Sequence, residues 1–208
     1  MSTFLSVLIS YLLGSIPTSA IAARMRGIDL RAEGSGNLGF TNALRILGPR
    51  AAVPVLIIDI AKGLVAVTVV ARALGTSSPL GPTGIALAAG LAAVAGHIWP
   101  AFARFRGGKG AATACGVFLA LAPLATLAVA AVWLIIVLTT RYVSPGSIIS
   151  AALLPFAVFI EARSRGIAQP LTLVIAAAAV AAAIILKHRS NIRRLLRGEE
   201  NRFGKPDR

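Results

Sequence analysis

Long apolar runs separated by short polar segments dominate this chain of 208 residues. The runs occupy about residues 3–23, 49–74, 81–103, 111–140, 146–160 and 170–186. Runs near 20 residues long match the thickness of a bilayer crossed by an α-helix, whereas a membrane barrel would show alternating segments of roughly 10 residues. The pattern therefore predicts an all-α, polytopic integral membrane helical bundle that forms a single domain over residues 1–208.

Composition supports a membrane protein without a cofactor. Hydrophobic residues make up 57% of the chain, above the roughly 45–50% typical of soluble domains. The uncharged start M-S-T-F-L-S and the length of the first run favour a retained transmembrane helix over a cleaved signal peptide. The single cysteine, Cys115, allows no internal disulfide. No histidine pair stands at helix spacing, so we expect neither a metal site nor a cofactor.

The fourth apolar run is too long for one ordinary span, and Pro123 interrupts it. Proline inside a helix removes a hydrogen bond and clashes with the preceding turn. The run is therefore either one kinked helix or two short helices, at about 111–122 and 124–140. Apolar segments of roughly 10–14 residues can also be re-entrant, so a full crossing by 111–122 stays open at this point.

The charge distribution predicts the topology. Lysine and arginine number 21 against 7 acidic residues, a balance that in a soluble protein would suggest nucleic acid. Basic residues also gather in the cytoplasmic loops of membrane proteins, so we expect no nucleic-acid partner. With seven spans, most cations share one side, in residues 24–50, 104–109 and 187–208 and at Arg141. This favours seven transmembrane helices, with a periplasmic N-terminus and a cytoplasmic C-terminus.

Four polar segments then share the cytoplasmic face, at about residues 24–50, 104–113, 141–147 and 187–200. The first contains E-G-S-G-N-L-G-F-T-N-A-L-R, from Glu33 to Arg45. Its glycines allow several N–H groups to face one anion. Neutral donors and one planar cation accompany them, namely Ser35, Asn37, Thr41, Asn42 and Arg45. The segment predicts an anion site; the alternative is a flexible surface loop.

The second polar segment is R-F-R-G-G-K-G, in which Lys109 is flanked by Gly107, Gly108 and Gly110. A glycine turn that leads into a helix N-terminus suits an anion, because free N–H groups and the positive end of the helix dipole face it. The segment is not a nucleotide-binding P-loop, since Ala103 replaces the first glycine of that motif. The alternative is a basic anchor for lipid head groups, next to the interfacial aromatic Trp99.

The remaining polar positions give weaker signals. His188 and Asn191 are three residues apart in the C-terminal segment, so they would share a helix face. Asp59 and Lys62 lie inside the second run, where they either lock helices together or act near the site. For His97 we expect a packing or supporting role. Two serines of the turn after Arg141, Ser144 and Ser147, are of a type that usually caps or turns the chain.

Three ordered motifs resemble those of a known enzyme family. They are S-G-N-L-G-F-T-N-A-L-R, G-H-I-W-P-A-F-A-R-F-R-G-G-K-G-A-A-T and H-R-S-N-I-R-R-L-L-R-G-E-E. Together with Y-L-L-G-S-I-P-T-S and D-I-A-K-G, they resemble the bacterial acyl-phosphate:glycerol-3-phosphate acyltransferases, the PlsY family, from about residue 11 to 200. Phe40 and Trp99 depart from the usual family residues, and both lie between the polar positions.

The resemblance implies a reaction and a location. Acyl phosphate and sn-glycerol 3-phosphate would give 1-acyl-glycerol 3-phosphate (lysophosphatidic acid) and phosphate, the first step of bacterial phospholipid synthesis. The protein would be a multi-pass protein of the bacterial inner membrane, in contact with membrane lipid, with a cytoplasmic active site and a functional link to the soluble enzyme that makes acyl phosphate. The alternatives are a transporter or channel for a small organic phosphate and, third, a lipid-binding scaffold.

The resemblance also implies roles for residues. Catalytic residues would be Ser35, Arg45, Lys109, His188 and Asn191, and substrate-binding residues Asn37, Thr41, Asn42, Gly107, Gly108, Gly110, Ser147 and Glu199. Lys109, its glycines and Arg45 would hold the phosphate of glycerol 3-phosphate, while the acyl phosphate head would be bound by Ser35, Asn37, Thr41 and Ser147. His188 and Asn191 would orient the glycerol hydroxyl, with Glu199 as an outer support. The general base is either His188 or a substrate phosphate oxygen.

Overall fold

The computed structural model describes residues 2–75, 78–167 and 170–202, and the regular structure in these ranges is entirely helical. Six helical segments are long and apolar enough to cross a membrane: Ser2–Arg24, Pro49–Leu74, Gly81–Ala103, Pro123–Thr140, Val143–Ser164 and Pro170–Lys187. Five follow the predicted runs closely, and Pro123–Thr140 is the second half of the long fourth run. The predicted all-α fold is therefore confirmed for the described residues.

The chain divides into two compact units, Met1–Leu121 and Ala122–Arg208. The division falls at the proline break that the sequence predicts. Helix α7 (Ala111–Leu121) ends just before Ala122, and α8 (Pro123–Thr140) begins directly after it. The fourth run is thus two helices rather than one kinked helix. With 11 residues, α7 is only about 16 Å long, whereas a bilayer core is about 30 Å thick.

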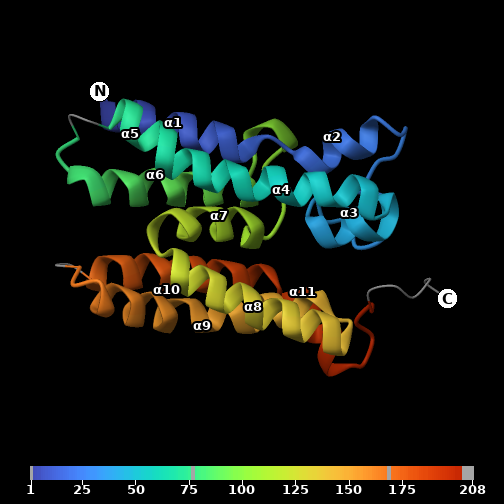
Figure 1. The fold of residues 1–208 in the computed structure, drawn as a ribbon. Coiled ribbons are helices and arrows are strands. Elements are labelled where there is room, and N and C mark those ends of the chain that lie inside the picture. Colours follow the sequence, from blue (N-terminus) through green and yellow to red (C-terminus); the bar gives the residue numbers. More distant parts are fainter. Residues whose placement is uncertain (1, 76–77, 168–169, 203–208) are drawn as a thin grey trace. The chain divides into compact units, whose positions relative to one another are not determined.

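The first unit is built on two pairs of packed helices. Its elements are α1 (Ser2–Ser15), α2 (Thr18–Arg24), α3 (Phe40–Leu47), α4 (Pro49–Val65), a π-helical turn η1 (Ala66–Val70), α5 (Ala71–Leu74), α6 (Gly81–Ile98), a 3-10 turn η2 (Ala101–Ala103) and α7. Helix α1 packs along α6, and α4 packs along α7 (Figure 1). The end of α6 and the start of α7 are joined by the glycine segment.

Glycines allow these pairs to approach closely. A Cβ atom on Gly14 of α1 would overlap the carbonyl of Ala93 in α6, and one on Gly116 of α7 would overlap the carbonyl of Ile60 in α4. Membrane helices gain little from burying apolar side chains, since lipid is equally apolar. Close backbone contact through small residues is therefore a main source of their packing energy.

The first apolar run is broken, which the sequence analysis does not predict. Helix α1 ends at Ser15 and α2 begins at Thr18, with Ile16 and Pro17 between them. Pro17 has no N–H to donate to the preceding turn, so the helix cannot continue through it. The break leaves backbone carbonyls that need other donors, and the carbonyl of Ile16 becomes important below.

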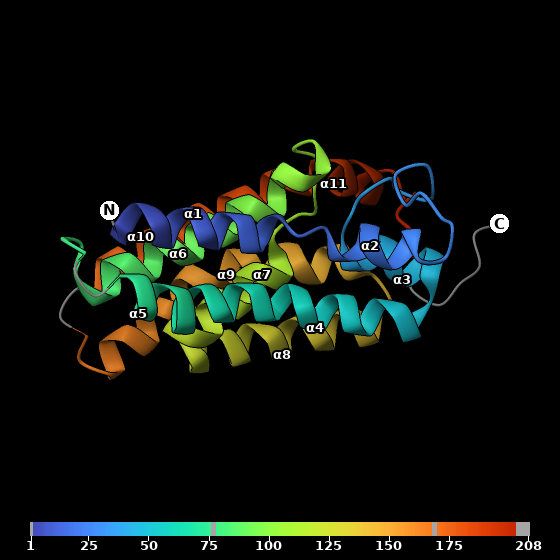
Figure 2. The same cartoon turned by 90° about the horizontal axis from the view of Figure 1, so that it is seen from above.

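The second unit contains α8, α9 (Val143–Ser164), α10 (Pro170–Lys187) and α11 (Arg189–Leu196). Helix α9 packs against both α8 and α10, and α11 follows α10 after a break at His188 (Figure 2). The turn between α8 and α9 is short because Arg141 adopts a left-handed conformation, with φ 61°. The buried carboxylate of Glu161 in α9 accepts a hydrogen bond of 2.7 Å from the N–H of Ala125, which caps the start of α8.

Candidate functional site

The first polar segment is partly helical, since α3 covers residues that the sequence analysis treats as loop. Within it, Asn42 is almost fully buried and holds the preceding loop in place. Its Oδ1 accepts from the N–H of Ser35 at 3.0 Å, and its Nδ2 donates to the carbonyls of Leu30 and Glu33, both at 3.1 Å. Both amide hydrogens are thus committed to the protein. The Asn42 side chain therefore shapes the loop that carries Ser35, and its contact with substrate stays a prediction.

The other predicted residues of this segment lie nearer the surface. Thr41 and Arg45 are four residues apart in α3, so they share one face of that helix, and both are half-buried. Ser35 is exposed and Asn37 is half-buried. These four side chains are therefore more accessible to a solute than the buried Asn42.

The glycine segment folds back on the end of α6. The N–H of Gly108 donates to the carbonyl of His97 at 3.1 Å, and that of Gly107 donates to the carbonyl of Ile98 at 3.3 Å. These two N–H groups bond to the end of α6 in this structure, and phosphate binding by the Gly107–Gly110 backbone stays a prediction. Gly110 has φ +86° and leads directly into α7, as predicted for a glycine turn before a helix.

The anion-binding capacity of this segment lies at the start of α7. The first turn of an α-helix has N–H groups without intrahelical carbonyl partners, and the positive end of the dipole lies there. Lys109 lies two residues before Ala111, the first residue of α7, and is half-buried. The Thr113 hydroxyl, also in the first turn, is buried without a hydrogen-bond partner among the described residues. A charged side chain and the helix N-terminus together suit a phosphate.

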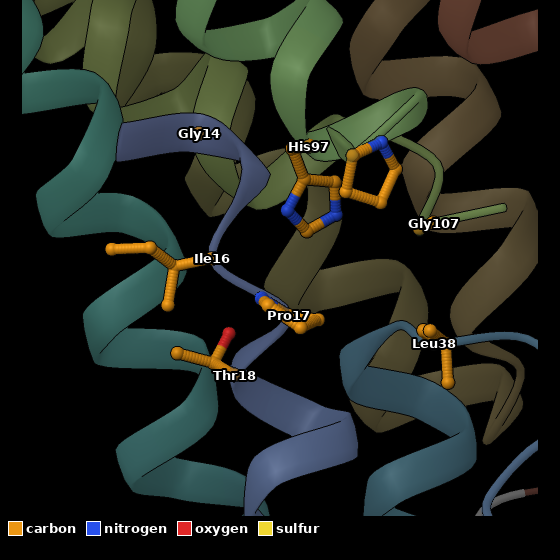
Figure 3. Close-up of a pocket in the computed structure, with 9 residues that line it drawn as sticks. Gly14, Ile16, Pro17, Thr18, Leu38, His97 and Gly107 are labelled. Atoms are coloured by element: carbon orange, nitrogen blue, oxygen red, sulfur yellow. The ribbon is translucent and has the colours of Figure 1, made fainter. Parts of the chain in front are cut away.

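A small pocket joins the first polar segment to the glycine segment (Figure 3). It is lined by Gly14, Ile16, Pro17, Thr18, Leu38, His97, Pro100, Gly107 and Gly108. Leu38 comes from the S-G-N-L-G motif and Gly107 from the R-G-G-K-G motif, so segments about 70 residues apart in the sequence meet here. The guanidinium of Arg31 adds a second connection, since it donates to the carbonyl of Ala103 at 2.6 Å.

In the second unit, Glu200 is the centre of a buried hydrogen-bond cluster. Its Oε1 accepts from the Ser144 hydroxyl at 2.8 Å and from Asn191 Nδ2 at 2.7 Å, while its Oε2 accepts from Arg194 Nε at 2.8 Å. The predicted support, Glu199, is exposed. Gly198 has φ +70°, and the resulting turn after α11 directs the second glutamate inward. The acid that contacts Asn191 in this structure is therefore Glu200, and the supporting role of Glu199 stays a prediction.

His188 and Asn191 are both buried at the junction of α10 and α11. The Nδ1 atom of His188 lies 2.8 Å from the carbonyl of Ile184. A carbonyl only accepts hydrogen bonds, so Nδ1 carries the hydrogen and a neutral ring has its lone pair on Nε2. This is the nitrogen that a general base at this position would use.

The two serines after Arg141 have different environments. Ser144 donates to Glu200, as described above. Ser147, the serine predicted to bind substrate, is half-buried in the first turns of α9. Its hydroxyl donates to the carbonyl of Val143 at 3.2 Å and accepts from the indole N–H of Trp133 at 3.2 Å. Ser144 thus joins the 141–147 segment to the 187–200 segment.

Sequence reasoning did not identify Glu200 and Ser144 as parts of the site. Adjacent glutamates cannot be told apart from the sequence alone, since the φ angle of Gly198 decides which one turns inward.

The described residues contain no group of three histidine, cysteine or acidic side chains that could hold a metal ion.

The six apolar helical segments of membrane-spanning length define a class, the polytopic helical membrane proteins. The sequence model of the glycerol-3-phosphate acyltransferase family matches residues 4–198. The chain belongs to this family. Membership of this family identifies the chain as an acyltransferase rather than a transporter, a channel or a lipid-binding scaffold.

Individual relatives agree along nearly the whole chain. The glycerol-3-phosphate acyltransferase of Geobacter sulfurreducens is 49% identical over 195 residues, 94% of each chain. That of Chlorobaculum parvum is 43% identical over 226 aligned positions, covering 98% of this chain and 97% of the relative. The crystal structure of PlsY, an integral membrane glycerol 3-phosphate acyltransferase in its glycerol 3-phosphate form, is 39% identical, with a TM-score of 0.86 over 98% of this chain and 96% of that chain. Its lysophosphatidic acid form gives a TM-score of 0.83 at 38% identity, with the same coverage. This chain is accordingly a multi-pass membrane protein.

Proposed function

We propose that this chain transfers an acyl group from acyl phosphate to the 1-hydroxyl of sn-glycerol 3-phosphate. The products are 1-acyl-glycerol 3-phosphate and phosphate, in the first step of phospholipid synthesis in a bacterium. The observation that carries the proposal is the glycine turn that places Lys109 at the N-terminus of α7, beside a pocket shared with the first polar segment. The solved relative with glycerol 3-phosphate supports the acceptor, and the one with lysophosphatidic acid supports the product.

Cationic side chains and helix N–H groups provide the charge for phosphate binding in this proposal. Lys109 and Arg45 hold the phosphate of glycerol 3-phosphate, together with the N–H groups of the first turn of α7. Ser35, Asn37 and Thr41 bind the head of acyl phosphate, since their side chains are accessible and offer hydrogen-bond donors. Asn42 acts indirectly, because it fixes the loop from which Ser35 projects.

In this proposal, His188 and Asn191 orient the glycerol hydroxyl. The hydroxyl oxygen attacks the acyl carbonyl carbon, the bond from that carbon to the phosphate oxygen breaks, and its electron pair leaves with phosphate. The hydroxyl proton passes either to His188 Nε2 or to a phosphate oxygen of the substrate. Phosphate is a good leaving group, so positioning and charge stabilisation can supply most of the rate enhancement.

The proposed setting is the bacterial inner membrane, with seven crossings, a periplasmic N-terminus and a cytoplasmic active site. Six segments have spanning length, and the seventh crossing is the short α7. The basic segments are on one side only when α7 is counted as a crossing. Single cysteines on either side of α7, at Arg106 and Leu124, in a Cys115→Ala background, test this with a membrane-impermeant maleimide, since both positions are exposed. Labelling of the two positions from opposite sides is expected, and labelling of both from the same side would refute seven crossings.

The activity test uses lipid-reconstituted protein, palmitoyl phosphate and radiolabelled glycerol 3-phosphate, and measures label in an organic extract. Palmitoyl-CoA serves as a parallel donor. We expect product from palmitoyl phosphate alone, in keeping with a soluble enzyme that supplies acyl phosphate. Product from palmitoyl-CoA as well would show that the enzyme also accepts acyl-CoA as a donor. No product from either donor would overturn the proposal.

Variants separate the two phosphates. Lys109→Ala should raise KM for glycerol 3-phosphate by at least about tenfold, because one charge-assisted contact contributes about 1.5–3 kcal/mol. Arg106→Ala, which removes an exposed cation from the same segment, is the matched control and should change KM little. A rise confined to KM for palmitoyl phosphate would show that Lys109 binds the donor instead.

The proton acceptor can be tested at His188. His188→Gln keeps a polar side chain but removes the base. A general base usually contributes about 100-fold or more. A fall in kcat of that size supports His188 as the base, whereas a fall of less than about tenfold assigns the proton to substrate phosphate.

A further inference from the structure

A buried ion pair lies beside the pocket of the first unit and takes no part in the proposed chemistry. Asp59 and Lys62 of α4 are 1% and 3% exposed, and Lys62 Nζ lies 2.7 Å from Asp59 Oδ1. Charges inside a membrane protein are costly unless they are paired and hydrogen-bonded. A pair this deeply buried is therefore expected to have several further partners.

These partners come from the break between α1 and α2. Lys62 Nζ donates to the carbonyl of Ile16 at 2.5 Å and to the Thr18 hydroxyl at 3.1 Å, and Thr18 donates to Asp59 Oδ1 at 2.5 Å. The Ile16 carbonyl stands at the break before Pro17, so the ammonium group stabilises an interruption of the helix. Ile16 and Thr18 also line the pocket (Figure 3).

The imidazole of His97 connects the pair to the glycine segment. Its Nδ1 lies 3.7 Å from Asp59 Oδ1, and the ring is 8% exposed. The other ring nitrogen, Nε2, lies against Gly108, where a Cβ atom would overlap it. The carbonyl of His97 accepts the Gly108 N–H as well. The glycine segment thus rests on His97 through both its ring and its backbone.

The location of the cluster argues against a purely helix-locking role. An ion pair that only joined helices could lie anywhere along α4, but this one contacts a residue that touches the neighbour of Lys109. We propose that Asp59, Lys62 and His97 position the glycine segment so that Lys109 can hold the substrate phosphate. The proposal rests on the proposed function, and all three are positioning residues that act through Gly108.

The experiment measures KM for glycerol 3-phosphate and for palmitoyl phosphate, and calorimetric binding of glycerol 3-phosphate to reconstituted protein. His97→Ala should raise KM and Kd for glycerol 3-phosphate by about tenfold, because a displaced Lys109 would lose a charge-assisted hydrogen bond to the phosphate. KM for palmitoyl phosphate should stay within about twofold. Ser6→Ala, another buried polar change in the first unit, is the control and should leave both KM values unchanged.

Two further variants distinguish positioning from general stability. His97→Asn keeps a donor on the Asp59 side of the ring but removes contact with Gly108, whereas Asp59→Asn removes the charge and keeps the shape. Both should raise KM for glycerol 3-phosphate. Gly108→Ala alone should strongly raise KM for glycerol 3-phosphate. In a His97→Ala background the same substitution should raise this KM less, because the ring that the added methyl group overlaps is then absent.

The outcomes distinguish a failure of the proposed acyltransferase function from a failure of the positioning role. If the parent protein forms no product, the proposed function fails. If the parent is active and His97→Ala lowers only thermal stability, with KM and Kd unchanged, the positioning role is refuted. Additive effects of Gly108→Ala and His97→Ala would also refute it, because they would show that the two residues do not act on each other.

Discussion

Removal of the Glu200 carboxylate should strongly destabilise the second unit. Glu200 accepts hydrogen bonds from Ser144, Asn191 and Arg194. A hydrogen bond to a charged group contributes about 1.5–3 kcal/mol. The pair with Arg194 counts for less, since that side chain is 32% exposed and solvent screens it. The hydrogen bonds from Ser144 and Asn191 contribute about 1.5 kcal/mol each at the lower end of this range. Glu200→Ala should therefore lower the free energy of unfolding by at least about 3 kcal/mol.

The assay is thermal unfolding in detergent or lipid together with steady-state kinetics. A loss of this size should lower Tm by several degrees, and kcat should fall because Asn191 loses the acceptor that orients its amide. The neighbouring Glu199→Ala is the matched control: it removes the same charge from an exposed position and should leave both Tm and kcat near those of the parent. Equal effects of the two substitutions would refute the assignment of Glu200 as the buried support.

Three other substitutions test local contacts. Asn42→Ala should destabilise the loop before α3 by about 2 kcal/mol, because buried backbone groups lose their partners, and should speed tryptic cleavage there more than Asn37→Ala does; equal cleavage rates would contradict the anchoring role. Glu161→Ala should lower Tm by the equivalent of about 1 kcal/mol, since the Ala125 N–H loses its cap; an unchanged Tm would count against that cap. Gly116→Val should reduce the yield of folded protein, because its side chain would overlap α4, and a normal yield would show a looser contact between α4 and α7.

The hydrophobic pattern predicts most of the fold. Five of the apolar runs match the spanning segments, because a helix must be both apolar and long enough to cross a bilayer. Pro123 marks the break between α7 and α8 for a local reason, the missing N–H of proline. Pro17 acts in the same way, but it lies near the end of a run that is long enough to span without interruption, so the pattern conceals it.

The candidate site is less predictable from the sequence. Glycine and lysine content identifies the segment before α7 as an anion site, but not which N–H groups stay available. Gly107 and Gly108 use theirs on carbonyls at the end of α6. Asn42 has the same chemistry as Asn37, yet burial commits its amide to the loop. These differences depend on packing, which composition does not encode.

The sequence by itself determined the class of protein, the helical spans, the break at Pro123 and the family, because these follow from hydrophobic length, backbone chemistry and ordered motifs. Only the tertiary structure decided which polar side chains are committed to the protein and which remain accessible. It turned Glu200 inward and Glu199 outward, and it placed His97 between Asp59 and Gly108. The physical reason is that burial and hydrogen-bond partners arise from contacts between distant segments, so identical residue types acquire different roles.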